Sequence, residues 1–467
     1  MWIYDENVTY HENDDDLSFM ISNGSSSSKK QNHPKIKTEL LSKIINKHHT
    51  NVKYLPSIPL PHNIIAMPLL HEAARDATLI IFVVPHQFLS KEMFTTLSDV
   101  VAQNGNCRAI SLVKGLDFVD LDDYNSGGGG NNGGAVKIKR PSLISDGVIV
   151  KGMMASSLKG SSLFQCGVLM GANVANDLAV AATAISPSSS SSSLSSIVPL
   201  PCESTLACNF HESSIPSPSN NDNLTLNQRT LAIFHTPSIF RVKHVRDVAG
   251  TEVCGALKNV IALGAGFVDA LSSSSSSSSS GGSTGGNTKA ALIRVGLHEM
   301  KLFAKRFFGN AVKDETFLES CGIADLIVTC YNGRNRKCAE EFAHRRQLST
   351  GNQNQHQHQH QNHSHTVSET CSDLWTTIEH DLLKGQKLQG TSTCDGVIST
   401  LDTLSSSLSS SSFPLMRAIH GIAFLGNPVE SILDGIVIMD DNEVCDEDEE
   451  DGKGGTNTNS AIFRSKL

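Results

Sequence analysis

The sequence predicts an α/β domain with a parallel sheet over residues 1–247, followed by an all-helical domain over residues 248–439. In the first half, short apolar runs bounded by turn residues alternate with helical patterns, which is typical of parallel strands joined by helices. From Val248 onward only helical periodicity remains. Residues 440–467 are rich in Asp, Glu and Gly, so we expect an acidic, flexible tail there.

Four apolar runs are predicted to be strands buried on both faces of the sheet. They are Leu79–Val84, Ala109–Val113, Gly147–Val150 and Gly167–Met170. Three of them are followed directly by chemically interesting residues, namely Pro85 to Phe88, Lys114 and Gly115, and Gly171 to Asn173. Ligands of doubly wound sheets bind outside the carboxyl ends of the strands, so this placement indicates a nucleotide-binding domain. Taken singly, each turn is equally typical of a plain polar connection.

The segment from Thr251 to Leu271 predicts a helix that is apolar on nearly every side and yet carries Lys258. Burial lowers the pKa of a lysine, and a lysine near neutrality is suited to proton transfer to or from a substrate oxygen. Alternatively, Lys258 reaches the surface or pairs with a carboxylate. This segment alone supports the two interpretations equally.

Low-complexity segments interrupt both predicted domains, and they dilute the hydrophobic content of the 467 residues to 39%. The five segments are Asp120–Ala135, Ser186–Asn223, Ser272–Gly286, Thr350–Ser368 and Ser405–Ser412. We expect disordered surface loops, because the entropy cost of closing a loop grows only slowly with its length. The histidines between His356 and His365 could bind a transition metal, but a repeat expansion explains their spacing more simply. No metal site is predicted.

Composition argues against several classes of protein. A net charge of -9 argues against nucleic-acid binding. No apolar run approaches the roughly 18 residues of a membrane helix, and the amino end has no basic then apolar leader, so we expect no membrane association and no secretion. The 11 cysteines lack a C-x-x-C pair, which indicates reduced intracellular thiols rather than disulfides or zinc.

Several strings, in order along the chain, resemble the cytosolic-type NAD-dependent glycerol-3-phosphate dehydrogenases. In the second half they are GALKNVIALGAGFVDAL (255–271), NTKAALIR (287–294), FLESCGIADLIVTCYNGRNRK (317–337) and LLKGQKLQG (382–390). Upstream they are MWIYDENV (1–8), HNIIAMPLLHEAARDATLIIFVVPHQFL (62–89), ISLVKGLD (110–117) and VLMGANVANDLA (168–179).

The resemblance implies a Rossmann-like NAD domain followed by an all-α substrate domain of the 6-phosphogluconate dehydrogenase carboxyl-terminal type. It also implies reversible reduction of dihydroxyacetone phosphate by NADH to glycerol 3-phosphate, with NAD as the cofactor and a homodimer as the assembly.

By resemblance, Lys258 is the proton donor and acceptor at the C2 oxygen of the substrate. Lys114 and Asn259 match residues of the same pocket that polarise or position this oxygen. Asp325 and Thr329 match the pair that orients the lysine and the substrate. These two residues are four apart, so they share one face if the segment is helical. A helix-capping or surface acid is the alternative role for Asp325.

The string GRNRK at 333–337 contains the residues that match the family's contacts with the substrate phosphate. Arg334 and Asn335 are those residues, and Arg334 also approaches the dinucleotide in the family. A guanidinium group is a planar donor fork that suits a phosphate. Without the resemblance, a short basic cluster is more often a solvated helix end.

The resemblance also implies a set of contacts with the cofactor. Lys387 and Gln389 match a loop that closes over the nicotinamide side. Tyr4, Phe88 and Ala175 occupy positions that contact the dinucleotide in the family, and the two aromatic rings are expected to pack near the adenine and the nicotinamide ribose.

The sequence departs from the family at its start. A G-x-G-x-x-G turn that would cradle the pyrophosphate is absent, and Trp2 to Tyr4 match the family's second strand. We therefore expect an incomplete NAD domain: either the sequence is a piece of a longer one, or the sheet has an open edge and a damaged cofactor site. Two alternative hypotheses remain open at this point. The chain could be a non-catalytic relic of the family, or it could be a dehydrogenase of the 3-hydroxyacyl or 6-phosphogluconate type. The GALKNV and GRNRK strings argue against the latter.

The printed sequence closes on Ser465, Lys466 and Leu467 after an acidic, glycine-rich stretch. A carboxyl-terminal S-K-L is an address read by the peroxisomal import receptor. We therefore expect a peroxisome or a glycosome-like organelle, with the cytoplasm as the alternative.

Overall fold

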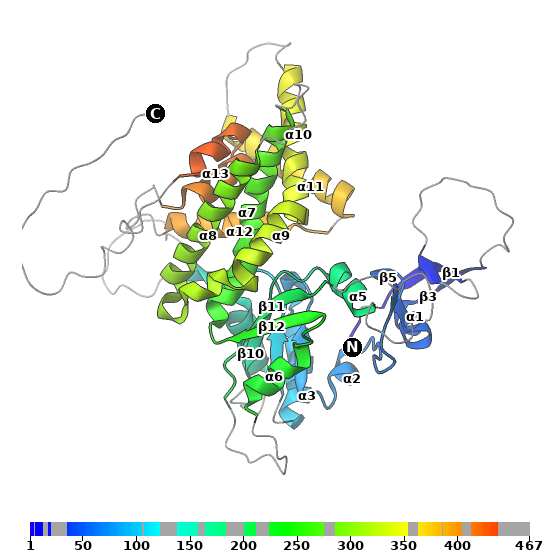
Figure 1. Ribbon diagram of the computed structural model, residues 1–467. Coiled ribbons are helices and arrows are strands. Elements are labelled where there is room, and N and C mark those ends of the chain that lie inside the picture. Colours follow the sequence, from blue (N-terminus) through cyan, green and yellow to red (C-terminus); the bar gives the residue numbers. More distant parts are fainter. Residues whose placement is uncertain are drawn as a thin grey trace, which may run out of the picture.

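The computed structural model describes residues 1–3, 5–12, 17–19, 35–104, 107–121, 138–156, 164–183, 200–211, 224–274, 285–353, 363–384, 386–403 and 412–437. Figure 1 shows a helical body stacked on a sheet-containing body, with a small unit of strands and one helix beside the latter. The sheet lies in the first half of the described chain and the helical body in the second half, which agrees with the predicted α/β and all-α parts.

Five strands form the main sheet. In spatial order they are β12 (Phe240–Val245), β11 (Cys202–Ala207), β10 (Cys166–Met170), β7 (Arg108–Ser111) and β6 (Leu79–Phe82). β6, β7 and β10 are parallel, β11 runs antiparallel to β10, and β12 is parallel to β11. The structure thus confirms three of the four predicted strands and the parallel sheet they build.

The predicted strand Gly147–Val150 is wrong. These residues belong to the π-helix η2 (Ile144–Val150), which continues directly into α4 (Lys151–Ser156). The backbone N–H groups of Ile144 and Ser145, which a helix start leaves unpaired, donate to the carboxylate of Glu252. A short apolar run fits a buried strand and a buried helix equally well, so periodicity alone could not decide between them.

The prediction that Ser186–Asn223 is a disordered loop is also wrong in part, because β11 lies inside it. Thr205, Leu206 and Ala207 are fully buried, so the sheet takes up this short apolar stretch despite its serine-rich surroundings. Four helices and one strand likewise reach into other predicted loops. They are α7 (Val248–Ser274), α8 (Gly286–Phe308), α10 (Arg334–Gln353), α11 (His363–Leu383) and β8 (Leu116–Leu121). The remaining parts of the five predicted loops lie mostly outside the described residues.

Side chains alternate between the two faces of the sheet, as strand geometry requires. Ile110, Leu169 and Leu206 pack on one face in a cluster that includes side chains of α6 (Leu226–Phe234). On the other face, Ala109 packs with residues of α3 (Lys91–Asn104) and α4, whereas Val168 belongs to the core of the helical body. The sheet therefore packs against the helical body through Val168, Met170 and Ala207, while its other apolar residues form separate cores with its own helices.

A small unit precedes the main sheet. It contains the antiparallel strands β1 (Asn7–Glu12), β2 (Leu17–Phe19) and β3 (Lys35–Leu40), then α1 (Leu41–His48), β4 (Thr50–Asn51) and β5 (Leu55–Pro59). Its own core surrounds the fully buried Tyr10. Trp2 and Met67 form an isolated parallel bridge, and within the described part of the chain β6 pairs only with β7.

Shorter elements connect these layers. α2 (Leu70–Ala74) precedes β6, η1 (His86–Phe88) follows it, and α5 (Ala175–Thr183) follows β10. The antiparallel hairpin of β8 (Leu116–Leu121) and β9 (Ile138–Leu143) contacts α12 (Gln389–Thr403) of the helical body.

The helical body is built around α7. The other helices are α8 (Gly286–Phe308), α9 (Asp325–Asn332), α10, α11, α12 and α13 (Pro414–Phe424), with the short turns η3 (Gly309–Ala311), η4 (Asp314–Leu318), η5 (Ser320–Ala324) and η6 (Val429–Gly435). α8, α9, α10, α12 and α13 all contact α7 (Figure 1). Contrary to the sequence-based expectation, α7 is long and apolar enough to cross a membrane. However, 94% of its apolar 18-residue stretch is buried inside the protein. Such burial is typical of a core helix.

α7 and α10 approach closely at Gly266. A Cβ atom built on Gly266 would lie 2.2 Å from the carbonyl oxygen of Arg336 and 2.8 Å from the Cβ of Ala339. A backbone carbonyl on a packed helix has little room to move, so only glycine allows this contact.

We predict that Gly266→Ala lowers the free energy of unfolding by about 1 to 3 kcal/mol, the usual cost of overpacking a core. Gly286→Ala is the matched control, since no atom lies within 4 Å of a Cβ built there. Urea denaturation of both variants measures the difference. Equal stability of the two variants would contradict this account of the α7–α10 contact.

Candidate active site

Lys258 lies in the middle of α7 and only 3% of its surface is exposed. Its ammonium group forms an ion pair with Oδ1 of Asp325, which is also 3% exposed and begins α9. Lys114 follows β7 in the sheet-containing body, and its Nζ lies 3.5 Å from Oδ2 of the same carboxylate. Two cations from different bodies thus share one buried carboxylate, and the lysine that the sequence predicts to be buried pairs with an acid rather than reaching the surface.

Burial lowers the pKa of Lys258 to about 7, and the positive charge of Lys114 acts in the same direction. The negative charge of Asp325 opposes both effects without cancelling them. The unperturbed pKa of a lysine is about 10.4, so at neutral pH this ammonium group can both release and take up a proton.

Thr329 lies one turn after Asp325 on α9, so the two residues share a helix face as the spacing predicts. Its hydroxyl donates to the backbone oxygen of Asp325 at 2.6 Å and lies 3.5 Å from Oδ1 of the carboxylate. Asp325 Oδ2 is buried and accepts no hydrogen bond within the described structure. Its charged neighbour is the Lys114 ammonium at 3.5 Å, which pairs with Oδ2 without forming a hydrogen bond to it.

A chain of amide hydrogen bonds runs beside Lys258. The side-chain amide of Asn335 donates to Oδ1 of Asn259 at 3.0 Å, and the backbone N–H of Gly390 donates to Oδ1 of Asn335 at 3.0 Å. Asn259 and Asn335 are both buried. A Cβ on Gly390 would lie 2.6 Å from Asn335 Oδ1 and 2.7 Å from the carbonyl oxygen of Asn259, so this contact needs a glycine. The first turns of α10 and α12 thereby meet next to the catalytic candidate.

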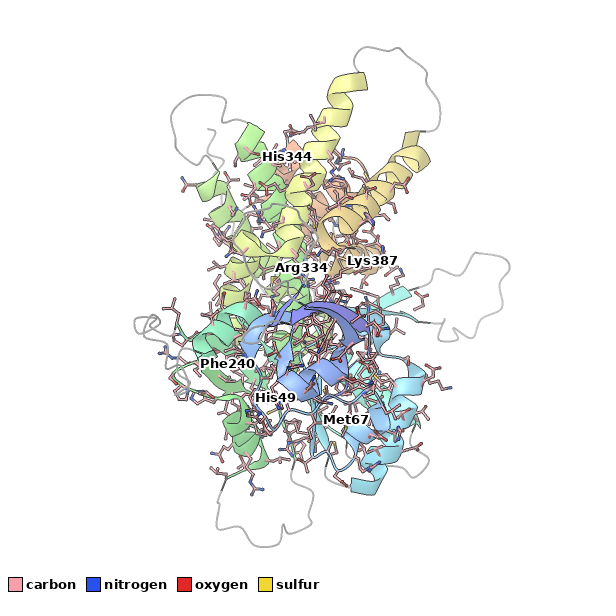
Figure 2. The ribbon with its side chains drawn as sticks, turned by 90° about the vertical axis from the view of Figure 1, so that its right-hand side faces the viewer. His49, Met67, Phe240, Arg334, His344 and Lys387 are labelled. Atoms are coloured by element: carbon pink, nitrogen blue, oxygen red, sulfur yellow. The ribbon has the colours of Figure 1, made fainter. Side chains whose placement is uncertain are left out.

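Arg334 is the first residue of α10, and its guanidinium group is exposed to solvent. Nη1 donates to Oε1 of Gln386 at 2.8 Å. Nearby, the Lys387 ammonium donates to Oε2 of Glu379 at 2.8 Å. Figure 2 shows Arg334 and Lys387 at the same height, where the helical body meets the sheet-containing body. Gln389 begins α12.

Two of the predicted cofactor contacts, Phe88 and Ala175, lie after parallel strands of the sheet. Phe88 lies in η1 after β6 and is 59% exposed, and Ala175 begins α5 after β10 and is also exposed. In the same loop as Phe88, Nδ1 of His86 is buried without a hydrogen-bond partner in the described structure, 3.7 Å from a Cβ built on Gly115. Tyr4 lies outside the described residues.

Three features of the site were not predicted from the sequence. Glu252 anchors η2 to α7, Glu379 binds the segment before α12, and His86 leaves a ring nitrogen unpaired. The sequence signal for Glu252 was the presence of an acidic residue in the otherwise apolar start of α7.

The histidines at 356, 358 and 360 lie outside the described residues, and among the residues that are described no group of three or more His, Cys, Asp or Glu could hold a metal.

Two protein families match the chain in succession. Residues 35–194 match "NAD-dependent glycerol-3-phosphate dehydrogenase N-terminus", and residues 247–434 match "NAD-dependent glycerol-3-phosphate dehydrogenase C-terminus".

Individual relatives agree with this match. The human protein named "Glycerol-3-phosphate dehydrogenase [NAD(+)], cytoplasmic" is 36% identical over 390 residues, which are 83% of this chain and 82% of the human protein. The protein named "Glycerol-3-phosphate dehydrogenase [NAD(+)]" from Cuphea lanceolata is 35% identical over 396 residues, with 85% of this chain and 79% of the relative covered.

Solved structures give the same result. The glycerol-3-phosphate dehydrogenase of Saccharomyces cerevisiae superposes with a TM-score of 0.57 at 32% identity, over 85% of this chain and 86% of the yeast protein. The Dunaliella salina protein also gives a TM-score of 0.57, at 31% identity, and this chain spans 52% of its length.

Proposed function

This chain belongs to the family of NAD-dependent glycerol-3-phosphate dehydrogenases, and we propose that Lys258, Asp325 and Lys114 carry out the proton transfer of its reaction. The family interconverts dihydroxyacetone phosphate and glycerol 3-phosphate with NAD as cofactor. The comparisons give no support to the alternative of a non-catalytic relic. The single observation that carries the proposal is the buried ammonium of Lys258, which shares the carboxylate of Asp325 with Lys114.

The residues at the carboxyl ends of the parallel strands fit a bound dinucleotide. Phe88 offers an exposed ring, and the unpaired Nδ1 of His86 offers a buried hydrogen-bonding atom beside the Lys114 loop. Arg334, Lys387 and the exposed Ala175 are further residues that we expect to contact the dinucleotide. When bound there, NADH supplies the hydride that reduces C2 of the substrate.

The protein's own residues would supply the proton for the C2 oxygen. Lys258 donates it during reduction and takes it back during oxidation, and a pKa of about 7 suits both directions near neutral pH. Asp325 holds the ammonium in place through its ion pair. The hydroxyl of Thr329 stabilises the start of α9 by its bond to the backbone oxygen of Asp325. Lys114 is 30% exposed at its side chain, so it can hold a substrate oxygen while it also favours deprotonation of Lys258.

The substrate phosphate would bind at the start of α10. Arg334 supplies a charged donor, Asn335 an amide, and the amino end of a 20-residue helix carries a partial positive charge. Asn335 also binds Asn259, which follows Lys258 on α7. The proposed phosphate site and the proton donor are therefore neighbours, so one small substrate could place its phosphate at α10 and its carbonyl group at Lys258.

We predict that Lys258→Met lowers kcat by about 10²-fold to 10⁴-fold, the usual contribution of a positioned acid or base. NADH binding should change little, because the ammonium is directed at Asp325. Steady-state kinetics and fluorescence titration with NADH measure the two effects. Near-normal turnover would remove Lys258 from the mechanism.

For Arg334→Ala we expect binding of dihydroxyacetone phosphate to weaken by about 1.5 to 3 kcal/mol, the typical contribution of a hydrogen bond to a charged group. The preference of the enzyme for dihydroxyacetone phosphate over unphosphorylated dihydroxyacetone, measured as a ratio of kcat/KM, should fall by the same free energy. The ratio of kcat/KM for the two substrates is the measurement, and an unchanged ratio would mean that the phosphate binds elsewhere.

The assembly and the location remain proposals. The resemblance supports a homodimer. The residues Ser465, Lys466 and Leu467, which lie outside the described part of the chain, support import into peroxisomes. The human relative carries "cytoplasmic" in its name, which favours the cytoplasm instead.

A fluorescent protein that ends in residues 452–467 should colocalise with a peroxisomal marker, because the import receptor reads the terminal tripeptide. The same fusion without Leu467 should stay in the cytosol. Fluorescence microscopy distinguishes the two distributions. A diffuse signal from the intact tail would favour the cytoplasm.

A further inference from the structure

We propose that Glu379 is a positioning residue that fixes the segment Gln386–Gln389 beside the site, and so sets the affinity for the phosphorylated substrate. This inference rests on the function proposed above. Glu379 lies near the end of α11, faces away from solvent, and is 7% exposed. Its two carboxylate oxygens have separate partners on the segment: Oε1 accepts from the backbone N–H of Leu388 at 3.0 Å, and Oε2 accepts from Lys387 Nζ at 2.8 Å.

Outside regular secondary structure, this segment is held by a backbone bond from Gln386 N to Leu383 O and by contacts with side chains. Residues 386–388 belong neither to a helix nor to a strand, and Lys384, just after α11, has a φ of 53°. In addition to Glu379, Arg334 binds the side chain of Gln386, and Asn335 binds the backbone of Gly390. The segment is therefore held between one acid on α11 and the two residues of α10 that are proposed to bind phosphate.

The two bonds of Glu379 contribute unequally to holding the segment. The Lys387 side chain is 66% exposed, so water screens its ion pair with Glu379, and exposed pairs contribute little. The bond to Leu388 N is buried, and its loss would leave a buried N–H without a partner. The backbone bond is therefore the anchor, and the ion pair sets where the Lys387 ammonium lies.

Release of this anchor would reach the phosphate site directly. Without Glu379, Leu388 would lose its buried partner, and the neighbouring Gln386 and Gly390 would be held less firmly against Arg334 and Asn335. Lys258 and Asp325 lie on α7 and α9 and would keep their ion pair. The expected signature is therefore a raised KM for dihydroxyacetone phosphate with little change in kcat.

The test compares Glu379→Ala with Glu379→Gln. The alanine variant should raise the KM for dihydroxyacetone phosphate about tenfold or more, as expected for losing a hydrogen bond to a charged group, with kcat within about threefold of wild type. The glutamine variant keeps an amide oxygen for Leu388 N, so it should stay within about threefold of the wild-type KM. Hydrogen exchange of the Leu388 amide should accelerate in the alanine variant and remain slow in the glutamine variant.

Asp381→Ala is the matched control, because Asp381 lies on the same helix and is also ion-paired, but with Arg345 on the outer surface. It should leave KM, kcat and Leu388 exchange unchanged. Thermal unfolding checks that each variant folds, and Glu379→Asp, which withdraws the carboxylate by one methylene, replaces an alanine variant that does not fold. Unchanged KM despite faster Leu388 exchange would overturn this inference alone. A wild-type chain that does not reduce dihydroxyacetone phosphate would overturn the proposed function and this inference together.

Discussion

The burial of one ammonium group is the constraint on which the site depends. Lys258 lies on a buried, mostly apolar helix, and its charge is tolerated there because the Asp325 carboxylate lies against it. That pairing requires α9 to begin next to the middle of α7. It also places Lys114, from the other body, against the same acid, so the site exists only where the two bodies meet.

Hydrogen bonds of uncharged groups extend this arrangement outward. Asn259 follows Lys258 in sequence, Asn335 binds Asn259, and the backbone of Gly390 binds Asn335, so three helices converge on one line of amides. Buried polar networks hold a unique arrangement only when each member has its partner. In this network, Asn259, Asn335 and Gly390 find hydrogen-bond partners on different helices. A substitution at any of these residues would therefore disturb the packing beside Lys258.

Sequence reasoning succeeded where a residue's environment follows from its own segment. The period of α7 predicted that Lys258 is buried, and the apolar runs predicted β6, β7 and β10. It was wrong where a distant group decides the conformation: Glu252 stabilises a helix start at Ile144 where the local pattern indicated a strand. β11 was missed because its few apolar residues are surrounded by serine, and the bond between Glu379 and Leu388 could not be read from spacing. The roles of the site residues stay predictions drawn from resemblance and geometry.

The hairpin of β8 and β9 has a consequence for how the chain can be divided. By sequence it belongs to the first domain, yet Phe118 fills the space above Gly396 on α12, where a Cβ would lie 2.4 Å from its ring. Residue 144, directly after β9, is bound to Glu252. A chimaera between two relatives that exchanges their second halves at the domain boundary would therefore pair a hairpin from one parent with a helix from the other. To keep this interface intact, a recombinant protein must take the β8–β9 hairpin from the same parent as α7 and α12. The exchangeable unit therefore consists of the hairpin and the helical body, which are separated in the sequence.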